Sequence, residues 1–277
     1  MPLREESFVC MTCGTQYPPA ASAPAACRTC TDERQYVPAP GQRWTTMAQI
    51  AVGHRNAFQQ LEPNLFGIGT TPTFGIGQRA LLVRTPHGNV LWDCITLLDE
   101  ATIAIITALG GLAAIAISHP HYYSSMVAWS RAFDNAPILL HAADRDHVMR
   151  PDAAIEYWEG ATREVVPGVT LTQVGGHFAG STVLQWDAGA EGRGALLTGD
   201  TVQVVPDRQF VGFMRSYPNL IPLPPQEVAR MAAVLDARRF DRIYGAWWDF
   251  HIERDAHAVV QASAARYAAW SRGMLRA

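Results

Sequence analysis

Two histidines separated by one residue follow a short apolar run in the middle of the chain. Residues 114–118 are small and mostly apolar, and His119, Pro120 and His121 come directly after them. Residues i and i+2 of a strand point to the same face, so the two imidazoles can converge on one spot. The proline cannot donate a hydrogen bond to a neighbouring strand, which predicts that pairing ends there. Two imidazoles directed at one point indicate a metal site whose other ligands come from elsewhere.

Other apolar segments end in residues of the same chemical kind. His177 follows two glycines in VGGHFAGS, Asp200 follows a glycine in LLTGDT, and the late apolar segment YGAWWDFHI carries His251. Taken singly, such a histidine is usually a hydrogen-bonded structural residue, and an aspartate after glycine is usually a turn former. Together, these strand ends predict a cluster of imidazoles and one carboxylate at the edge of a sheet.

Four of the five cysteines form a separate cluster near the N-terminus. Two Cys-x-x-Cys pairs, Cys10 with Cys13 and Cys27 with Cys30, offer four thiolates, the ligand set of a closed structural zinc site. The Pro/Ala-rich spacer has no apolar core, so a metal would have to hold this module together. Two disulfides are the weaker alternative in a reducing cytosol, and a redox-active dithiol is weaker still. The fifth cysteine, Cys94, is expected to be a small buried hydrophobic residue.

The composition excludes several classes of function. The 277 residues are 48% hydrophobic and 17% charged, with a formal net charge of −3, so no excess of cations favours nucleic acid. No apolar run approaches the roughly 18 residues of a membrane span. The N-terminus lacks a signal-peptide pattern, so we expect a cytoplasmic location. We expect a small-molecule substrate, with neither nucleic acid nor membrane as partner, and the sequence is compatible with an oligomer.

The remaining segments predict the elements that position these residues. Residues 31–45 read as a packed linker, 45–61 as a short helix, and 67–78 as a glycine-rich loop. In the rest of the chain, paired strands are followed by alternating helices and strands, and this order then repeats. It indicates two packed sheets with helices on the outside. Helices are predicted over 97–111, 124–133, 224–240 and 255–275. Two strands joined by a turn are predicted within 78–94, and further strands over 114–118, 137–142, 163–174, 181–188, 192–200 and 241–248.

From about residue 62 to the C-terminus, the chain resembles the metallo-β-lactamase-fold hydrolases. The segments SHPHYYS, GGHFAGS and LTGDT match the places of that family's metal ligands, and VLWDC around Asp93 resembles its aspartate-bearing strand. The resemblance implies an α/β fold, an αββα sandwich with the site at the edge between the two sheets. We therefore divide the chain into a zinc-ribbon-like four-cysteine module with its linker, residues 1–44, and an αββα domain, residues 45–277.

The resemblance implies His119, His121 and His177 as ligands of a first metal, with Asp200 as the carboxylate. The family's next aspartate and histidine fall on Tyr123 and Ser124, and its final histidine falls near Trp247. We therefore predict one metal at this cluster rather than two, with Asp200 as fourth ligand or as partner of the bound water. His251, four residues after Trp247, is an alternative ligand that would restore part of a second site.

This ligand set predicts a metal-dependent hydrolase. Three neutral imidazoles leave the ion its charge and a vacant position, where bound water becomes acidic near neutral pH. Asp200 would orient that water or accept its proton, and Tyr123 or Tyr122 would donate to the oxyanion formed from an ester, thioester, lactone or amide. The proline-rich segment 216–225 is a candidate cover for the site. Candidate pocket-wall aromatics are Phe74, Phe213, Trp247 and Trp248.

Two other functions remain compatible with the sequence. The first is a mononuclear non-haem iron oxygenase resembling the sulfur dioxygenases, with iron held by His119, His177 and Asp200. The second is a binding or scaffold protein whose catalytic site has decayed, because zinc ribbons often contact other macromolecules. Zinc is thus expected in a structural role at the cysteines and a catalytic role at the histidines, with iron as the alternative catalytic metal.

Overall fold

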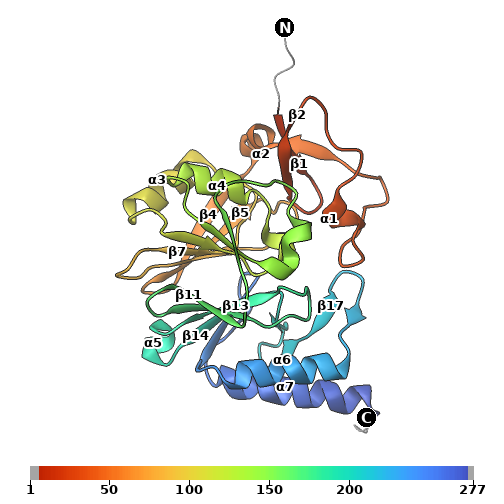
Figure 1. Cartoon of the computed structure of the whole chain (residues 1–277), viewed down its shortest axis with the longest axis vertical. Coiled ribbons are helices and arrows are strands. Elements are labelled where there is room, and N and C mark those ends of the chain that lie inside the picture. Colours follow the sequence, from red (N-terminus) through yellow and green to blue (C-terminus); the bar gives the residue numbers. More distant parts are fainter. Residues whose placement is uncertain (1–5, 274–277) are drawn as a thin grey trace.

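Two β-sheets packed face to face form the body of the chain, described for residues 6–273 in a computed structural model (Figure 1). Helices α3 (Glu100–Ala108) and α4 (Met126–Ala132) cover the outer face of one sheet, and α6 (Pro225–Asp236) and α7 (Ala256–Ser271) cover the other. This arrangement confirms the predicted αββα sandwich. Residues 1–5 of the predicted module and residues 274–275 of the predicted final helix lie outside the described residues.

The first sheet has seven strands in the order β10-β9-β8-β7-β6-β5-β4. The strands from β4 to β7 pair antiparallel, and β8, β9 and β10 then add in parallel. The three residues of β8 are buried, as expected of a strand covered on both faces. The strand bounds are β4 (Arg55–Glu62), β5 (Leu65–Thr71), β6 (Ala80–Val83), β7 (Val90–Trp92), β8 (Ala114–Ala116), β9 (Ile138–His141) and β10 (Ile155–Trp158).

The second sheet has six strands in the order β11-β12-β13-β14-β19-β20. Its inner face meets that of the first sheet in a shared core that includes Trp92, Leu171 and Leu197. The strand bounds are β11 (Thr162–Val166), β12 (Val169–Gln173), β13 (Thr182–Trp186), β14 (Ala195–Gly199), β19 (Arg242–Gly245) and β20 (His251–Ile252). Two short ribbons, β15 (Gln203–Val204) with β16 (Val211–Gly212) and β17 (Met214–Ser216) with β18 (Ile221–Pro222), follow β14 along the chain.

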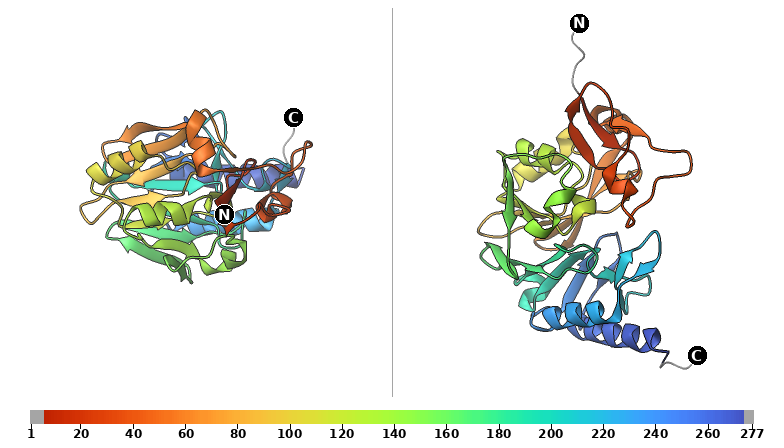
Figure 2. Two further views of the ribbon diagram at one scale, coloured as in Figure 1. Left: turned by 90° about the horizontal axis from the view of Figure 1, so that it is seen from above. Right: turned by 45° about the vertical axis from the view of Figure 1, so that its right-hand side comes forward.

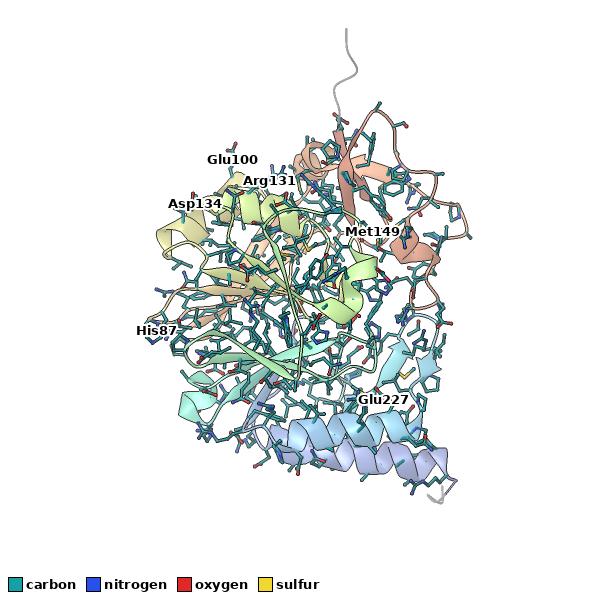
Figure 3. The ribbon with its side chains drawn as sticks, in the orientation of Figure 1. His87, Glu100, Arg131, Asp134, Met149 and Glu227 are labelled. Carbon is teal, nitrogen blue, oxygen red and sulfur yellow. The ribbon has the colours of Figure 1, made fainter. Side chains whose placement is uncertain are left out.

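The outer helices pack through one apolar face each. In α6, the side chains of Val228, Met231, Ala232 and Leu235 are buried, which is the i, i+3, i+4, i+7 spacing of an amphipathic helix. On the opposite layer, Glu100, Arg131 and Asp134 are exposed and point outward (Figure 3). No helix within residues 6–273 combines the length and the apolar character that crossing a bilayer requires. The remaining short elements are α5 (Gly189–Gly192), the 3-10 turn η1 (Pro120–Tyr122) and the 3-10 helix η2 (Ala142–His147).

The predicted helix over residues 45–61 is wrong in most of its length. The segment divides into β3 (Trp44–Thr46), α2 (Met47–Gly53) and the edge strand β4. A capping box between Thr46 and Gln49 begins α2, and the helix ends at Gly53. From residue 55 onward the side chains alternate between more and less exposed, which is the period of a strand.

Part of the predicted glycine-rich loop is also a strand, because β5 runs through it. A Cβ atom at Gly67 would lie 2.7 Å from the Trp248 ring, and one at Gly69 would lie 2.8 Å from it. Both glycines therefore leave room for an indole that lies flat on the strand. These two positions require glycine because the Trp248 side chain approaches the strand closely, and not because the backbone there is irregular.

The N-terminal segment folds as a small module against one edge of the sandwich (Figures 1 and 2). Its strands β1 (Glu6–Cys10), β2 (Gln16–Ala20) and β3 form a three-stranded sheet in the order β2-β1-β3, and α1 (Arg28–Thr31) carries the second cysteine pair. The backbone N–H of Gln16 donates to the Ser124 carbonyl at 2.9 Å, so the module is bonded to the loop that follows the histidine pair.

Candidate metal centres and the pocket beside them

His119 and His121 reach one point by a different path from the one predicted. Strand β8 ends at Ala116, and Pro120 begins the 3-10 turn η1, which contains His121. The backbone of His119 is still extended, whereas the turn redirects the residues that follow. The two imidazoles therefore converge because the chain turns, not because a strand continues.

The structure brings His119, His121, His177 and Asp200 together at the edge between the sheets. Each residue offers one ligand atom, and these atoms lie within 4.8 Å of one another. His121 Nδ1 is 3.3 Å from His177 Nε2, and His119 Nε2 is 3.6 Å from Asp200 Oδ2. A tetrahedral ion bound at about 2.0–2.1 Å places its ligand nitrogens roughly 3.3–3.4 Å apart. The cluster is therefore spaced to hold one ion.

Three atoms of this cluster are buried without a protein partner. His119 Nε2, His121 Nε2 and Asp200 Oδ1 form no hydrogen bond, and all three residues are almost fully buried. Buried polar atoms are nearly always hydrogen-bonded or bound to an ion, because desolvating them otherwise costs free energy. Such orphaned atoms fit the bound metal that the spacing indicates.

Neighbouring groups fix the orientation of the imidazoles. The Met214 carbonyl lies 3.1 Å from His177 Nδ1 and can only accept, so Nδ1 carries the proton and Nε2 keeps its lone pair. His119 Nδ1 lies 2.8 Å from Ser118 Oγ. Asp93, at the place that the resemblance implied, accepts a 2.7 Å hydrogen bond from the Ser118 backbone N–H. Asp93 thus fixes the backbone beside His119 rather than contacting the ligand atoms.

Burial keeps the imidazoles of His121 and His177 neutral at physiological pH. Loss of hydration, aided by the adjacent His119, lowers the pKa of His177 to about 3 and the pKa of His121 well below its usual 6.5. Neutral imidazole is the form that binds a metal. Burial also raises the pKa of Asp93 well above its ordinary value.

Asp200 approaches the histidines because the strand before it ends in glycine. A Cβ atom at Gly199 would lie 2.5 Å from Ser118 Oγ, so only glycine allows the end of β14 to come this close to the end of β8. Asp200 Oδ2 accepts a 2.9 Å hydrogen bond from Gln78 Nε2. Sequence reasoning missed Gln78, whose one signal is that it belongs to a polar Gln-Arg pair directly before the apolar strand β6.

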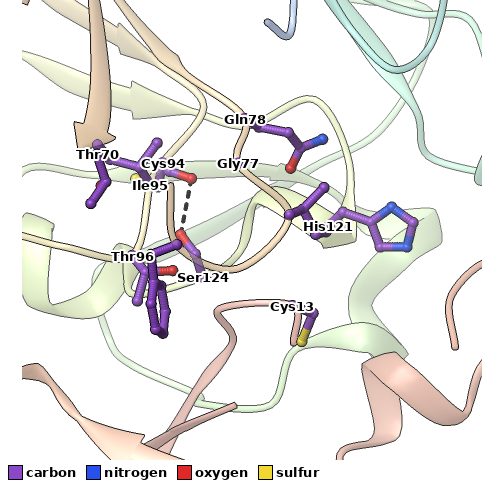
Figure 4. Close-up of a pocket in the computed structure, with 11 residues that line it drawn as sticks. Cys13, Thr70, Gly77, Gln78, Cys94, Ile95, Thr96, His121 and Ser124 are labelled. Carbon is purple, nitrogen blue, oxygen red and sulfur yellow. Dashed lines mark hydrogen bonds between the residues drawn. The ribbon is translucent and has the colours of Figure 1, made fainter. Parts of the chain in front are cut away.

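The residues at the positions of the family's second-metal ligands make other contacts in this chain. Tyr123 was predicted to face the site, but the turn η1 directs it into the core with Met126 and Trp129, so it is not placed to act on a substrate. Ser124 Oγ donates to the Cys94 carbonyl at 2.9 Å (Figure 4). His251 lies in β20, outside the cluster, with its Nε2 2.8 Å from Glu253 Oε1.

The other predicted aromatic residues divide between core and pocket. Tyr122 is buried, and its hydroxyl donates to the Arg79 carbonyl at 3.1 Å, which is a structural role. Phe213 packs in the core under α6 and α7. Phe74 lines a small cavity next to Cys94, and Trp248 covers β5. Of the four aromatics predicted to form a wall, Trp247 lines the pocket beside the histidines.

A pocket of about 300 Å³ opens onto the cluster. Its walls come from the N-terminal module, from the loop before β6, and from the proline-rich segment that follows β17. Three of the four cluster residues face it. The lining residues are Thr12, Gln35, Tyr36, Gly75, Ile76, His121, His177, Asp200, Gln203, Tyr217, Pro218 and Trp247.

The four N-terminal cysteines form a second, closed cluster. Their sulfur atoms lie within 4.8 Å of one another, with Cys10 to Cys30 at 3.6 Å and Cys13 to Cys27 at 3.5 Å. These separations exceed a disulfide bond of about 2.05 Å and approach the roughly 3.8 Å edge of a zinc tetrathiolate. The backbone N–H of Gly14 donates to the Cys10 carbonyl at 2.9 Å and closes the first knuckle.

Comparisons with known proteins agree with this architecture. No family model matches the sequence. Solved structures that resemble the chain include the metallo-β-lactamases VMB-1 (TM-score 0.59, 12% identity, 79% of this chain and 98% of that one) and DIM-1 exposed to ceftazidime (TM-score 0.57, 14% identity, 77% and 98%). SMB-1 in complex with mercaptoacetic acid also matches (TM-score 0.51, 16% identity, 76% and 93%).

A relative in sequence covers almost the whole chain. The "Uncharacterized protein YmaE" of Bacillus subtilis (strain 168) is 46% identical over 262 residues, which is 94% of this chain and 95% of YmaE. The solved structures show the fold, and the predicted resemblance to metallo-β-lactamase-fold proteins is confirmed at that level. The chain therefore belongs to the protein family of YmaE, and it has the metallo-β-lactamase fold.

Proposed function

We propose that this protein is a metal-dependent hydrolase with one catalytic ion, held by His119, His121 and His177 with Asp200 beside them. The observation that supports this most strongly is a set of buried donors that face one point and open onto a pocket. When bound, a zinc ion would supply a Lewis acid and an acidic bound water. We also propose that the four cysteines hold a second, structural zinc.

The residues of the chain have separate tasks in this proposal. The Met214 carbonyl holds His177 in the tautomer that leaves Nε2 free. Gln78 Nε2 holds Asp200 through Oδ2, so Oδ1 stays free to orient the attacking water or to accept its proton. Asp200 is 4% exposed, and such burial strengthens its interaction with any positive charge placed at the cluster.

A single catalytic ion fits these contacts better than two. Gln78 Nε2 already donates to Asp200 Oδ2, so one oxygen of this carboxylate is occupied by a protein donor. Tyr123 is in the core, Ser124 is bonded to Cys94, and His251 lies outside the cluster. Among residues 6–273, the groups with metal-ligand spacing are this cluster and the cysteines.

The geometry also favours a hydrolase over the two alternatives. An iron oxygenase of the two-histidine, one-carboxylate type would use two imidazoles, whereas here the third imidazole lies 3.3 Å from its neighbour and faces the same point. A decayed scaffold has no need for a cluster whose buried His119, His121 and Asp200 atoms lack protein partners and which opens onto a pocket. Metal analysis separates iron from zinc, and oxygen consumption separates an oxygenase from a hydrolase.

The test is turnover of carbonyl substrates by the metal-loaded protein. We would assay 4-nitrophenyl esters, an acyl thioester, a lactone and an anilide, comparing the unmodified chain with His177→Ala. We expect hydrolysis of at least one class, and a loss of about 1,000-fold or more in the variant, the scale of removing a metal-activated nucleophile. Absence of turnover at full metal occupancy, or equal rates in both proteins, would contradict the proposal.

A further inference from the structure

The four-cysteine module is attached directly to the segment that carries the third histidine. Arg34 Nε donates to the His177 carbonyl at 2.8 Å, and the Arg34 guanidinium lies 4.2 Å from the centre of the Phe178 ring. Asp32 pairs with the same guanidinium at 2.8 Å, and both side chains are largely buried. The module is therefore fixed against the metal cluster rather than joined to it by a free linker.

The ribbon formed by β17 and β18 completes this attachment from the other side. Asn219 Nδ2 donates to the carbonyls of Glu33 and Gln35 at 2.9 and 2.8 Å, and Ser216 Oγ donates to the Arg34 carbonyl at 3.0 Å. Figure 2 shows this ribbon reaching up to the N-terminal module. The two segments, far apart in sequence, form one continuous rim around the pocket.

The metal knuckle itself belongs to the wall of the pocket. Thr12, between Cys10 and Cys13, lines the pocket together with Gln35 and Tyr36. Cys13 and His121 also line one small cavity of about 20 Å³ (Figure 4). Met149, which follows η2 in the sandwich, packs against the cysteine cluster. A change in the knuckle would therefore move the surface that a substrate contacts.

The pocket carries no cationic side chain that would bind an anionic substrate. Apart from the three cluster residues, its lining is neutral, and the Arg34 guanidinium faces Phe178 and Asp32. A charged group buried against this lining, away from the cluster and its proposed ion, would lose hydration without gaining a counter-charge. The part of the lining away from the cluster therefore selects uncharged groups.

Apolar surface lines the pocket from both of these segments. Tyr36 on the module side is 49% exposed, and Pro218 on the ribbon side is also exposed; both line the pocket. An apolar chain that leaves the cluster can therefore contact the Tyr36 ring on one side and the Pro218 ring on the other.

We infer that the four-cysteine module is the specificity-determining wall of the pocket, and that it selects uncharged substrates with an apolar chain lying between Tyr36 and Pro218. The inference rests on the proposed function only for the reaction that such a substrate undergoes. The recognition that it describes can be measured without turnover.

The experiment uses ligands that resemble a carbonyl substrate but cannot be hydrolysed. We would measure Kd by calorimetry for 2-hexanone, 2-octanone and 2-decanone on the metal-loaded full chain. We expect Kd to fall by roughly two- to fourfold per added methylene, the range for partial to full burial of that group. The same chain with a terminal carboxylate, 9-oxodecanoate, should bind at least fivefold more weakly than 2-decanone.

Two variants locate the chain-binding surface. Tyr36→Ala and Pro218→Ala should each raise Kd for 2-decanone by about fivefold while leaving Kd for 2-hexanone within twofold. Val52→Ala, at an 83% exposed apolar side chain on α2 outside the pocket, is the matched control and should change neither. Thermal unfolding of each variant verifies that it is folded.

The outcomes of the two proposals are separable. Chain-length dependence without hydrolysis of any carbonyl class would support the recognition surface and contradict the proposed hydrolase. This inference alone would be overturned if the protein hydrolyses a carbonyl substrate but its affinity for ketones does not depend on chain length. It would also be overturned if the Tyr36 and Pro218 variants behave like Val52→Ala.

Discussion

The cysteine cluster and the histidine cluster both gather four buried donors within 4.8 Å, but their surroundings differ. At the cysteines, Gln42 Nε2 donates to Cys10 Sγ at 3.0 Å, and the Tyr17 hydroxyl donates to Cys27 Sγ at 3.5 Å, so protein groups close the site. At the histidines, Asp200 Oδ1 has no partner and the cluster opens onto a pocket. Closed sites hold structural ions and open ones hold catalytic ions.

The two clusters also differ in what holds their residues in place. The cysteines come from one segment of 21 residues whose spacer has no core of its own. The histidines and Asp200 come from the ends of strands in two large sheets with extensive apolar cores. The first site should therefore depend on its ion for folding, whereas the second should exist before its ion binds. Four variants test this contrast.

Asp200→Asn should have the largest effect. It keeps an oxygen near the cluster but removes the negative charge and the basic oxygen, so we expect kcat to fall by about 100- to 10,000-fold, the scale of general-base loss. The unfolding midpoint should change little, because Gln78 still has an amide oxygen to which it can donate. The assay is steady-state hydrolysis of the best substrate, and a loss below tenfold would argue that Asp200 is only a structural residue.

Cys13→Ser should mainly affect stability. Loss of one thiolate weakens a site whose ion holds the module, and we expect a loss of roughly 3–5 kcal/mol in the free energy of unfolding, as for loss of a structural metal. Chemical denaturation measures it. Cys94→Ala, at a buried cysteine outside both clusters, is the control and should cost about 1 kcal/mol. Equal costs for the two variants would contradict an ion-dependent module.

Arg34→Ala should show that the two regions are coupled, because a change in the N-terminal module should affect the histidine cluster. Without the Nε donor, the His177 backbone is less firmly placed, and we expect about a tenfold loss in metal affinity at the histidine cluster, the lower end for partners that orient a ligand. Cobalt(II) titration followed by visible absorption measures this affinity. Arg28→Ala, on the exposed face of α1, is the matched control. If both variants bind cobalt equally well, the module does not position His177.

Asp144→Asn should have the smallest effect, and one that depends on pH. Burial raises the pKa of Asp144 to about 6, above its unfolded value near 3.8, and Oδ1 accepts a 2.7 Å hydrogen bond from the Gly180 N–H behind His177. A raised carboxyl pKa means that the folded state holds the proton more tightly. The contribution of Asp144 to stability is therefore greatest at low pH and is lost as pH rises from about 4 to about 6.

Asparagine keeps an oxygen that accepts from the Gly180 N–H, but it has no carboxyl group to ionise as the pH rises. Between pH 4 and pH 7, the free energy of unfolding of Asp144→Asn should rise by about 2 kcal/mol relative to that of the unmodified protein. Urea unfolding at both pH values measures the difference, and effects of other titrating groups cancel between the two proteins. A difference that is the same at both pH values would contradict the assigned pKa.

The sequence was most informative where chemistry has a residue-type signature. The two cysteine pairs and the residues His119, His121, His177 and Asp200 were predicted as clusters, and the structure places each set together. Tyr123 was misplaced because we extended a strand through Pro120, where a 3-10 turn begins. Gln78, Arg34 and Tyr36 were missed because their partners lie up to 143 residues away, or are backbone carbonyls that no side-chain pattern reveals.

Metal content per chain tests the central claim most directly. After expression in zinc-containing medium and removal of loosely bound ions, the unmodified protein should carry two zinc ions per chain, and His177→Ala should carry one, retained at the cysteines. Cys13→Ser should show the converse loss at the N-terminal module. One ion in both the unmodified protein and His177→Ala, or three in the unmodified protein, would contradict a single catalytic ion held by three converging imidazoles.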